Sequence, residues 1–168
     1  GVSGANLVDY VNDIDTSNTV DDKPIYYWVN EQEKTAPLDA GHVALVNCTG
    51  ITVKNLNLTN NAEGVLLAFT KNSTITQNTI TNNGEGIELR GSSSNNTISG
   101  NYIANNEGNG VNLHSSENNL FENTIIDNGN YGILLYFSHY NTISENNLTA
   151  NELGIYLYGS TYNNISSN

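Results

Sequence analysis

This chain has only one cysteine, two prolines and five basic residues (lysine and arginine). The single cysteine, Cys48, excludes an internal disulfide framework and a cluster of thiolate metal ligands. Because 17 acidic residues outweigh the five basic ones, the net charge is −12, and we expect no binding to nucleic acid or anionic membrane surfaces. No apolar run approaches the length of a membrane-spanning helix, so we expect no membrane insertion.

Asparagine is in excess, with 32 of the 168 residues. Asn is a poor helix former that favours turns and the left-handed conformation, so the composition argues against a helical protein. The length and the apolar content of 37% suit one domain with a modest core.

A repeat of 22 to 24 residues organises the chain from Gly64 onward. Its start, Gly-Val/Ile-x-Leu, returns at Gly86, Gly110, Gly132 and Gly154, and a second phrase resembling Thr-Ile-Ser-x-Asn keeps step with it. Apolar residues alternate over three or four positions and then stop at Asn, Gly or Ser, which is the pattern of very short strands. Such strands are stabilised when each pairs with its copy one repeat later.

The repeat therefore predicts an all-β chain, folded over residues 41–168 as a right-handed parallel β-helix with coils of roughly 22 residues. We expect three inner walls of apolar side chains. The first contains Val65, Leu67, Ile87, Leu89, Val111, Leu113, Ile133, Leu135, Ile155 and Leu157; the second Ile75, Ile98, Leu120, Ile143 and Ile165; the third Ile80, Ile103, Ile125 and Leu148.

The asparagines recur with the same period at two turns, where stacked side-chain amides can donate to one neighbour and accept from the other. This predicts one ladder of Asn55, Asn78, Asn101, Asn123, Asn146 and Asn168, and a second of Asn61, Asn83, Asn106, Asn128 and Asn151.

Residues 1–40 lack the repeat and hold both prolines and the only tryptophan, Trp28. Terminal units of solenoids are usually atypical, so we interpret this segment as an N-terminal cap or as outer strands flanking the first coil. At the other end, a unit that stopped at Asn168 would leave the core bare. We expect the native polypeptide to continue there, or a partner or neighbouring domain to cover that end.

The repeat phrase and the lead-in from Asn18 to Tyr27 resemble the NosD-like family of right-handed parallel β-helix proteins. The resemblance implies kinship with carbohydrate-binding and sugar-hydrolase β-helices of archaeal surface and secreted proteins, hence an extracellular or cell-surface location. The family name implies a periplasmic copper role. The residues do not favour copper, because only His42, His114 and His139 are present, with no methionine, and His114 and His139 are out of register.

Alternate residues of the repeated Gly-Ile-x-Leu strand are expected to point outward. With coils about 4.8 Å apart, they form a file of Leu66, Glu88, Asn112, Leu134 and Tyr156 beside a file of Ala68, Arg90, His114, Tyr136 and Tyr158. Aromatic rings flanked by polar groups suit sugars, so Arg90, His114, Tyr136, Tyr156 and Tyr158 are candidate carbohydrate-binding residues. The alternative is a purely structural aromatic stack, because cross-strand pairs stabilise sheets without any ligand.

The same face offers a catalytic reading. Glu88, Arg90, His114 and Tyr136 are the residue types that uronate lyases and epimerases on such scaffolds use, although the Asp-Pro-His motif of those epimerases is absent. Glu63 and Glu85, one coil apart, are the best carboxylate pair for a hydrolase and otherwise a weak calcium site. No other cofactor is implied.

Three hypotheses follow. The first is a non-catalytic, structural or adhesive β-helix domain that contacts a polysaccharide or cell-surface glycan through the outward Tyr/His/Arg face. The second is a polysaccharide-acting lyase, epimerase or hydrolase that uses the same face. The third is a head-to-tail assembly module of a surface layer.

Overall fold

A computed structural model describes residues 1–168 and consists almost entirely of short β-strands. Its one helical element is the 3₁₀ turn η1 (Leu7–Tyr10). The structure contains no helix with the length and apolar character of a membrane span. The prediction of an all-β chain is confirmed.

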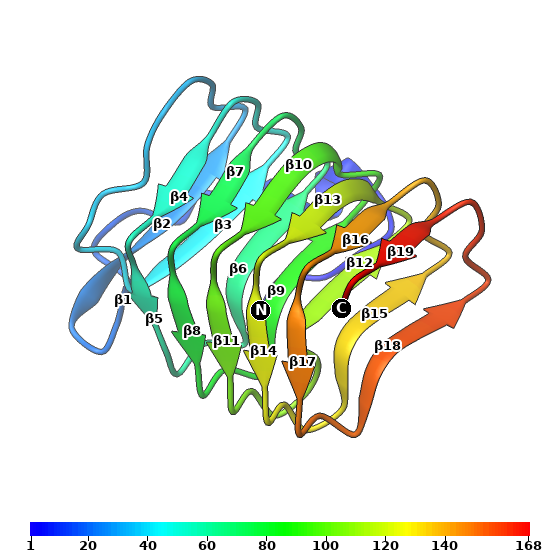
Figure 1. The fold of residues 1–168 in the computed structure, drawn as a ribbon. Helices are drawn as coiled ribbons and strands as arrows, with labels where there is room; N and C mark the ends of the chain where they lie inside the picture. Colours follow the sequence, from blue (N-terminus) through cyan, green and yellow to red (C-terminus); the bar gives the residue numbers. More distant parts are fainter.

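The strands form three sheets in which each strand pairs in parallel with the strand one coil later (Figure 1). The eight-stranded sheet contains β1 (Thr19–Val20), β2 (Lys23–Val29), β3 (His42–Val46), β6 (Glu63–Ala68), β9 (Glu85–Arg90), β12 (Val111–His114), β15 (Tyr131–Tyr136) and β18 (Leu153–Tyr158). The six-stranded sheet contains β4 (Thr52–Lys54), β7 (Thr74–Thr76), β10 (Ser94–Ser99), β13 (Glu117–Phe121), β16 (Thr142–Ser144) and β19 (Asn164–Ser166). The five-stranded sheet contains β5 (Asn57–Leu58), β8 (Thr79–Thr81), β11 (Tyr102–Ala104), β14 (Thr124–Ile126) and β17 (Asn147–Thr149). The predicted parallel β-helix is confirmed, and only β1 pairs antiparallel, with β2.

Equivalent apolar residues of successive coils face each other inside the stack. Ile98 of β10 pairs with Ile75 of β7 on one side and with Leu120 of β13 on the other, and all three are fully buried. The predicted inner walls are therefore correct. Leu157 and Ile165 are largely exposed, because no later coil among these residues covers them.

The repeat glycines have a steric cause. A Cβ at Gly110 would lie 2.7 Å from the carbonyl oxygen of Gly132 and would also collide with Cγ2 of Ile125. The backbone of each coil comes this close to the next one where the chain enters the eight-stranded sheet, so only glycine fits.

Both predicted asparagine ladders form, with one error. Asn101 shows the pattern: its Nδ2 donates to Oδ1 of Asn123 at 3.0 Å, and its Oδ1 accepts from Nδ2 of Asn78 at 3.0 Å. Asn55 is not a rung, because Leu56 occupies that position and its backbone N–H donates to Oδ1 of Asn78. A third ladder, which the sequence analysis missed, contains Asn96, Asn118, Asn141 and Asn163. These buried amides satisfy backbone groups at the turns, which explains the asparagine excess.

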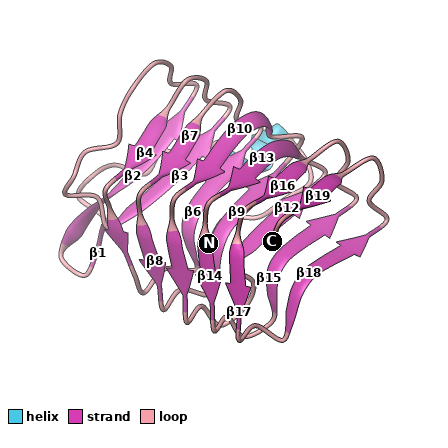
Figure 2. Ribbon diagram, in the orientation of Figure 1, coloured by secondary structure: helices cyan, strands magenta, loops and turns pink.

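The N-terminal segment divides into two parts. Strand β2 pairs in parallel with β3, so residues 23–41 form a first, shorter coil of the solenoid. Residues 1–14 instead lie on the outer face of the eight-stranded sheet, and Figure 2 places η1 (cyan) behind that sheet. Tyr10 of this segment is fully buried in a second, outer hydrophobic cluster with Leu66 and Ala68.

Candidate functional site

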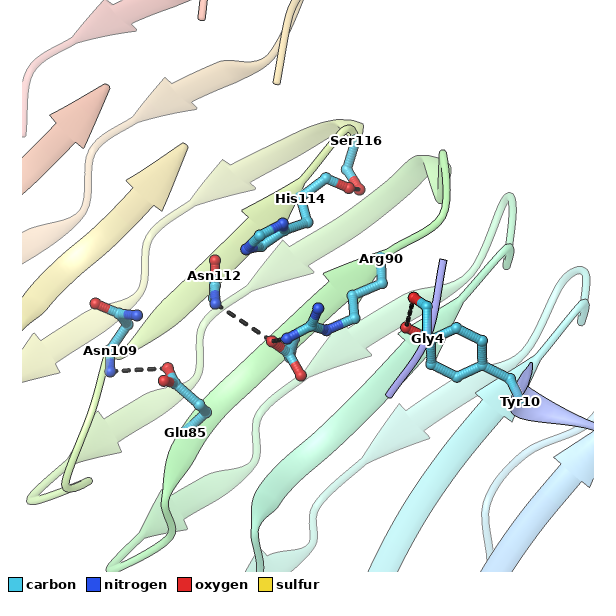
Figure 3. Close-up of polar contacts among 9 residues, drawn as sticks. Gly4, Tyr10, Glu85, Arg90, Asn109, Asn112, His114 and Ser116 are labelled. Atoms are coloured by element: carbon cyan, nitrogen blue, oxygen red, sulfur yellow. Dashed lines mark hydrogen bonds and ion pairs between the residues drawn. The ribbon is translucent and has the colours of Figure 1, made fainter. Parts of the chain in front are cut away.

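The four residues of the predicted polar and aromatic file lie in one row across the eight-stranded sheet. Strand register pairs His114 with Tyr136 and Tyr136 with Tyr158, while Arg90 ends the preceding strand β9. Figure 3 shows Arg90 and His114 on the same outer surface, with the N-terminal residues Gly4 and Tyr10 beside Arg90. The repeat register thus brings together residues that are far apart in the chain.

Arg90 is held by an ion pair with Glu88. Its Nη2 lies 2.6 Å from Oε1 of Glu88, and Asn112 Nδ2 donates to the same carboxylate oxygen at 3.3 Å. Burial alone would lower the pKa of Arg90, but the hydrogen bond and the attraction of Glu88 outweigh it and raise the pKa. The only arginine of the chain is therefore already neutralised by a protein carboxylate.

The first residues of the two outward files are not solvent-exposed, contrary to the sequence prediction. Leu66 and Ala68 point outward but are covered by the N-terminal segment. Glu88 is only 3% exposed and Asn112 is also buried. The exposed part of this face begins at Arg90 and His114 and continues through the tyrosines.

Tyr136, in the middle of the row, offers neither of its ring faces to a ligand. Tyr136 and Tyr158 stack on each other with centroids 5.1 Å apart and planes within 6°. The His114 ring lies 4.7 Å from Tyr136 on the preceding coil. Because both faces of Tyr136 are occupied, the row presents ring edges and hydroxyl groups outward. Tyr156 likewise pairs with Tyr131, at 4.8 Å.

His114 sits at the border between the buried ion pair and the tyrosines. Burial lowers its pKa, and the positive charge of Arg90 lowers it further. The ring is therefore neutral near pH 7, with one nitrogen able to donate and the other to accept a hydrogen bond.

A pocket of about 360 Å³ lies where the N-terminal segment meets the row. Gly4 and Ala5 form one side, and Arg90 and His114 form the other, together with Phe69, Gly91, Ser92 and Ser115. Two buried polar atoms in this region, Nε of Arg90 and Oδ1 of Asn112, have no hydrogen-bond partner within the protein. Sequence reasoning missed Gly4 and Ala5, because nothing in the repeat indicates where a non-repeating segment lies.

Glu63 and Glu85, the candidate calcium ligands, are register partners on β6 and β9. Burial raises the pKa of both carboxyl groups, and the nearby Glu88 raises that of Glu63 further. One oxygen of Glu85 accepts the backbone N–H of Asn109 at 2.8 Å, as Figure 3 shows. Neither residue borders the pocket beside Arg90.

The residues present do not fit a copper ion. No three His, Cys, Asp or Glu side chains lie close enough together to share a metal. Cys48 is buried, with its Sγ against the carbonyl oxygens of Trp28 and Val46, and Nδ1 of His139 is bonded to Thr161. Nδ1 of His42 is buried without a partner, but His42 belongs to no group of three such side chains.

In a comparison with protein families, residues 8–168 match the family described as periplasmic copper-binding protein (NosD). Neither the curated proteins nor the solved structures contain a match to the chain. The family match extends from the outer N-terminal segment through every coil of the solenoid, in agreement with the resemblance of the repeat phrase. The chain therefore belongs to the NosD family.

Proposed function

We propose that this chain is a non-catalytic β-helix domain that works outside the cytoplasm and binds polysaccharide along the outer face of its eight-stranded sheet. The observation that carries the proposal is the pocket between the N-terminal segment and the Arg90–His114 end of the row. The pocket continues into a line of tyrosine edges, so a chain-like ligand has a path across several coils.

The chemistry of the lining supports a hydroxyl-rich ligand. Serine hydroxyls, a neutral imidazole and a guanidinium offer both donors and acceptors around the same space.

Binding is better supported than catalysis. An uronate lyase or epimerase needs Arg90 to neutralise the carboxylate of its substrate, whereas here Glu88 neutralises Arg90 at 2.6 Å. Glu88 is itself buried and bonded to Asn112, so it is a poor acid or base for an external sugar.

Affinity gel electrophoresis with a panel of plant, bacterial and archaeal polysaccharides tests the proposal. At least one polysaccharide should retard the wild-type protein, and His114→Ala should remove the retardation. Tyr102→Ala is the matched control, because Tyr102 is an exposed aromatic residue on the five-stranded sheet. If no polysaccharide retards the wild-type protein, the row of Arg90, His114 and the tyrosines has only a structural role. If the wild type releases unsaturated or reducing sugar and His114→Ala does not, the chain is an enzyme and the non-catalytic proposal is wrong.

A further inference from the structure

One corner of the solenoid carries an aromatic residue in an unfavourable backbone conformation. The corner follows the eight-stranded sheet, and Phe69, Gly91, Ser115, Phe137 and Gly159 hold equivalent positions in successive coils, all with positive φ. Phe137 has a φ of 47°, in the left-handed region that is unfavourable for a bulky residue. Glycine at two of the equivalent positions shows that the fold does not need phenylalanine there.

Phe137 turns one ring face toward the protein and leaves the other free. It lies nearly perpendicular to Tyr136 and Tyr158, at 86° and 89°, with centroids 4.7 and 5.5 Å away. Since the faces of these tyrosines are used in the stack, Phe137 packs against their edges. It also lies over Gly159, where a Cβ would be 2.6 Å from its ring atoms. Phe137 remains 46% exposed, so its outer face is open.

The equivalent phenylalanine of an earlier coil shows what such a ring accepts. Phe69 lies over Gly91 in the same way as Phe137 lies over Gly159. The ring of Tyr10, from the N-terminal segment, packs against Phe69 edge-on at 5.9 Å. Phe69 thus has an aromatic partner from the N-terminal segment, whereas the rings paired with Phe137 are Tyr136 and Tyr158 of its own row.

Phe137 borders a second pocket, of about 440 Å³. The pocket shares Ser92 and Ser115 with the pocket beside Arg90, so the two adjoin. Lys71, Glu117 and His139 also line it. Nδ1 of His139 accepts the backbone N–H of Thr161 at 3.1 Å, which leaves Nε2 as the ring nitrogen that carries the hydrogen.

The charges around this pocket favour an uncharged ligand. Lys71 and Glu117 contribute one charge of each sign, and neither is in an ion pair. Arg90, which lines the adjoining pocket, is in an ion pair with Glu88. With a net charge of −12 on the whole chain, a polyanionic glycan would be repelled.

We propose that the corner pocket is a subsite for a neutral pyranose ring, which stacks its C–H face on Phe137 and bonds its hydroxyls to the serines, Lys71, Glu117 and His139. This inference rests on the proposed glycan binding and moves the stacking contact from the tyrosine row to the corner. An aromatic face suits the apolar side of a sugar, while its ring substituents reach polar groups around the rim.

The test measures affinities of the full chain for cellohexaose, mannohexaose, chitohexaose and hexagalacturonate by isothermal titration calorimetry. At least one neutral oligosaccharide should bind, and tighter than hexagalacturonate. Phe137→Ala and Phe137→Leu should each weaken it about tenfold, the size of one aromatic stacking contact. Phe137→Trp should bind within about threefold of wild type, because it keeps a ring face. Tyr102→Ala is again the control and should bind like wild type.

Four results would overturn the subsite. Wild-type affinity in Phe137→Ala together with loss of binding in His114→Ala would confine the glycan to the outer row, so the proposed function would stand without the corner. Wild-type affinity in Phe137→Leu would show that the ligand needs only an apolar contact at this position and does not stack on an aromatic ring. Preference for hexagalacturonate would exclude a neutral ligand. If no oligosaccharide or polysaccharide binds the wild-type chain, the subsite and the proposed function fail together.

Discussion

At the scale of single residues, the Glu88–Arg90 pair is asymmetric. The Glu88 side chain is 4% exposed and that of Arg90 28%. Arg90→Met leaves the buried Glu88 carboxylate without a positive charge beside it, whereas Glu88→Gln leaves a guanidinium that reaches water. We predict a loss of about 3 kcal/mol of unfolding free energy for Arg90→Met and about 1–2 kcal/mol for Glu88→Gln. Urea denaturation of both variants and of the double variant measures the losses, and equal losses would contradict the asymmetry.

His42 makes stability depend on pH. Burial lowers its pKa to about 4, while an unfolded chain protonates histidine near 6.5. Below pH 6.5 the unfolded chain therefore takes up a proton that the folded chain refuses, and stability falls until about pH 4. The stability advantage of wild type over His42→Gln should shrink by up to about 3 kcal/mol between pH 7 and pH 4. Urea denaturation at several pH values measures the difference in unfolding free energy between wild type and His42→Gln. Glu63 and Glu85 contribute to stability with the opposite pH dependence, but they are present in both proteins, so their contributions cancel in this difference. A constant difference would show that His42 titrates normally.

At the scale of the repeated element, the glycine at the start of each coil is a steric requirement. Gly110→Ala should cost about 3 kcal/mol, because the added methyl group meets Gly132 and Ile125. Gly100→Ala is the matched control: its Cβ would have only Thr76 Oγ1 nearby, at 3.9 Å, so only its positive φ of 63° is penalised. That penalty is about 1 kcal/mol. Thermal and urea denaturation compare the two, and equal losses would show that backbone conformation alone selects glycine.

The asparagine ladder is a second property of the repeat. Asn101→Ala removes donors to Asn123, Ile75 and Ser99 and an acceptor for the backbone N–H of Asn78. Because these groups are buried, we predict a loss of about 3–5 kcal/mol, from two or more unsatisfied groups. Asn57→Ala, an exposed asparagine on β5, should change stability by less than about 0.5 kcal/mol. A small loss in Asn101→Ala would mean that water replaces the ladder.

At the scale of the whole molecule, the N-terminal segment is fastened to the solenoid mainly through Tyr10. Its ring is fully buried, its hydroxyl donates to the carbonyl oxygen of Gly4 at 3.0 Å, and its own carbonyl oxygen accepts the Tyr27 hydroxyl. Tyr10→Ala should cost about 3–5 kcal/mol locally and detach residues 1–14 without unfolding the coils. Hydrogen exchange should show lost protection in residues 1–14 alone. Loss of protection throughout the solenoid would show that the segment folds as one unit with it.

Head-to-tail assembly also belongs to this scale and stays a prediction. In these 168 residues the last coil exposes Leu157 and Ile165, which in every other coil would lie in the core. Sedimentation velocity over a range of concentrations tests whether copies associate through this surface. A monomer at every concentration would count against the assembly module.

The row of Arg90, His114, Tyr136 and Tyr158 could be predicted from the sequence only in part. The spacing of Arg90, His114, Tyr136 and Tyr158 correctly placed them in one row, because register follows directly from the period. It did not reveal that Glu88 neutralises Arg90 or that the tyrosine faces are used in stacking. Phe137, one residue after Tyr136, was overlooked because a corner residue has no place in a pattern of alternation. A positive φ at a phenylalanine is visible only in the structure.

The sequence by itself determined the parallel β-helix, its coil length, its inner walls and most of its asparagine rungs. These features follow from one period, which places each residue above its copy regardless of the rest of the chain. Only the tertiary structure decided which outward residues remain exposed and which aromatic face is free. Those depend on where the non-repeating residues 1–14 pack and how neighbouring rings orient, and neither is encoded in the spacing of the repeat.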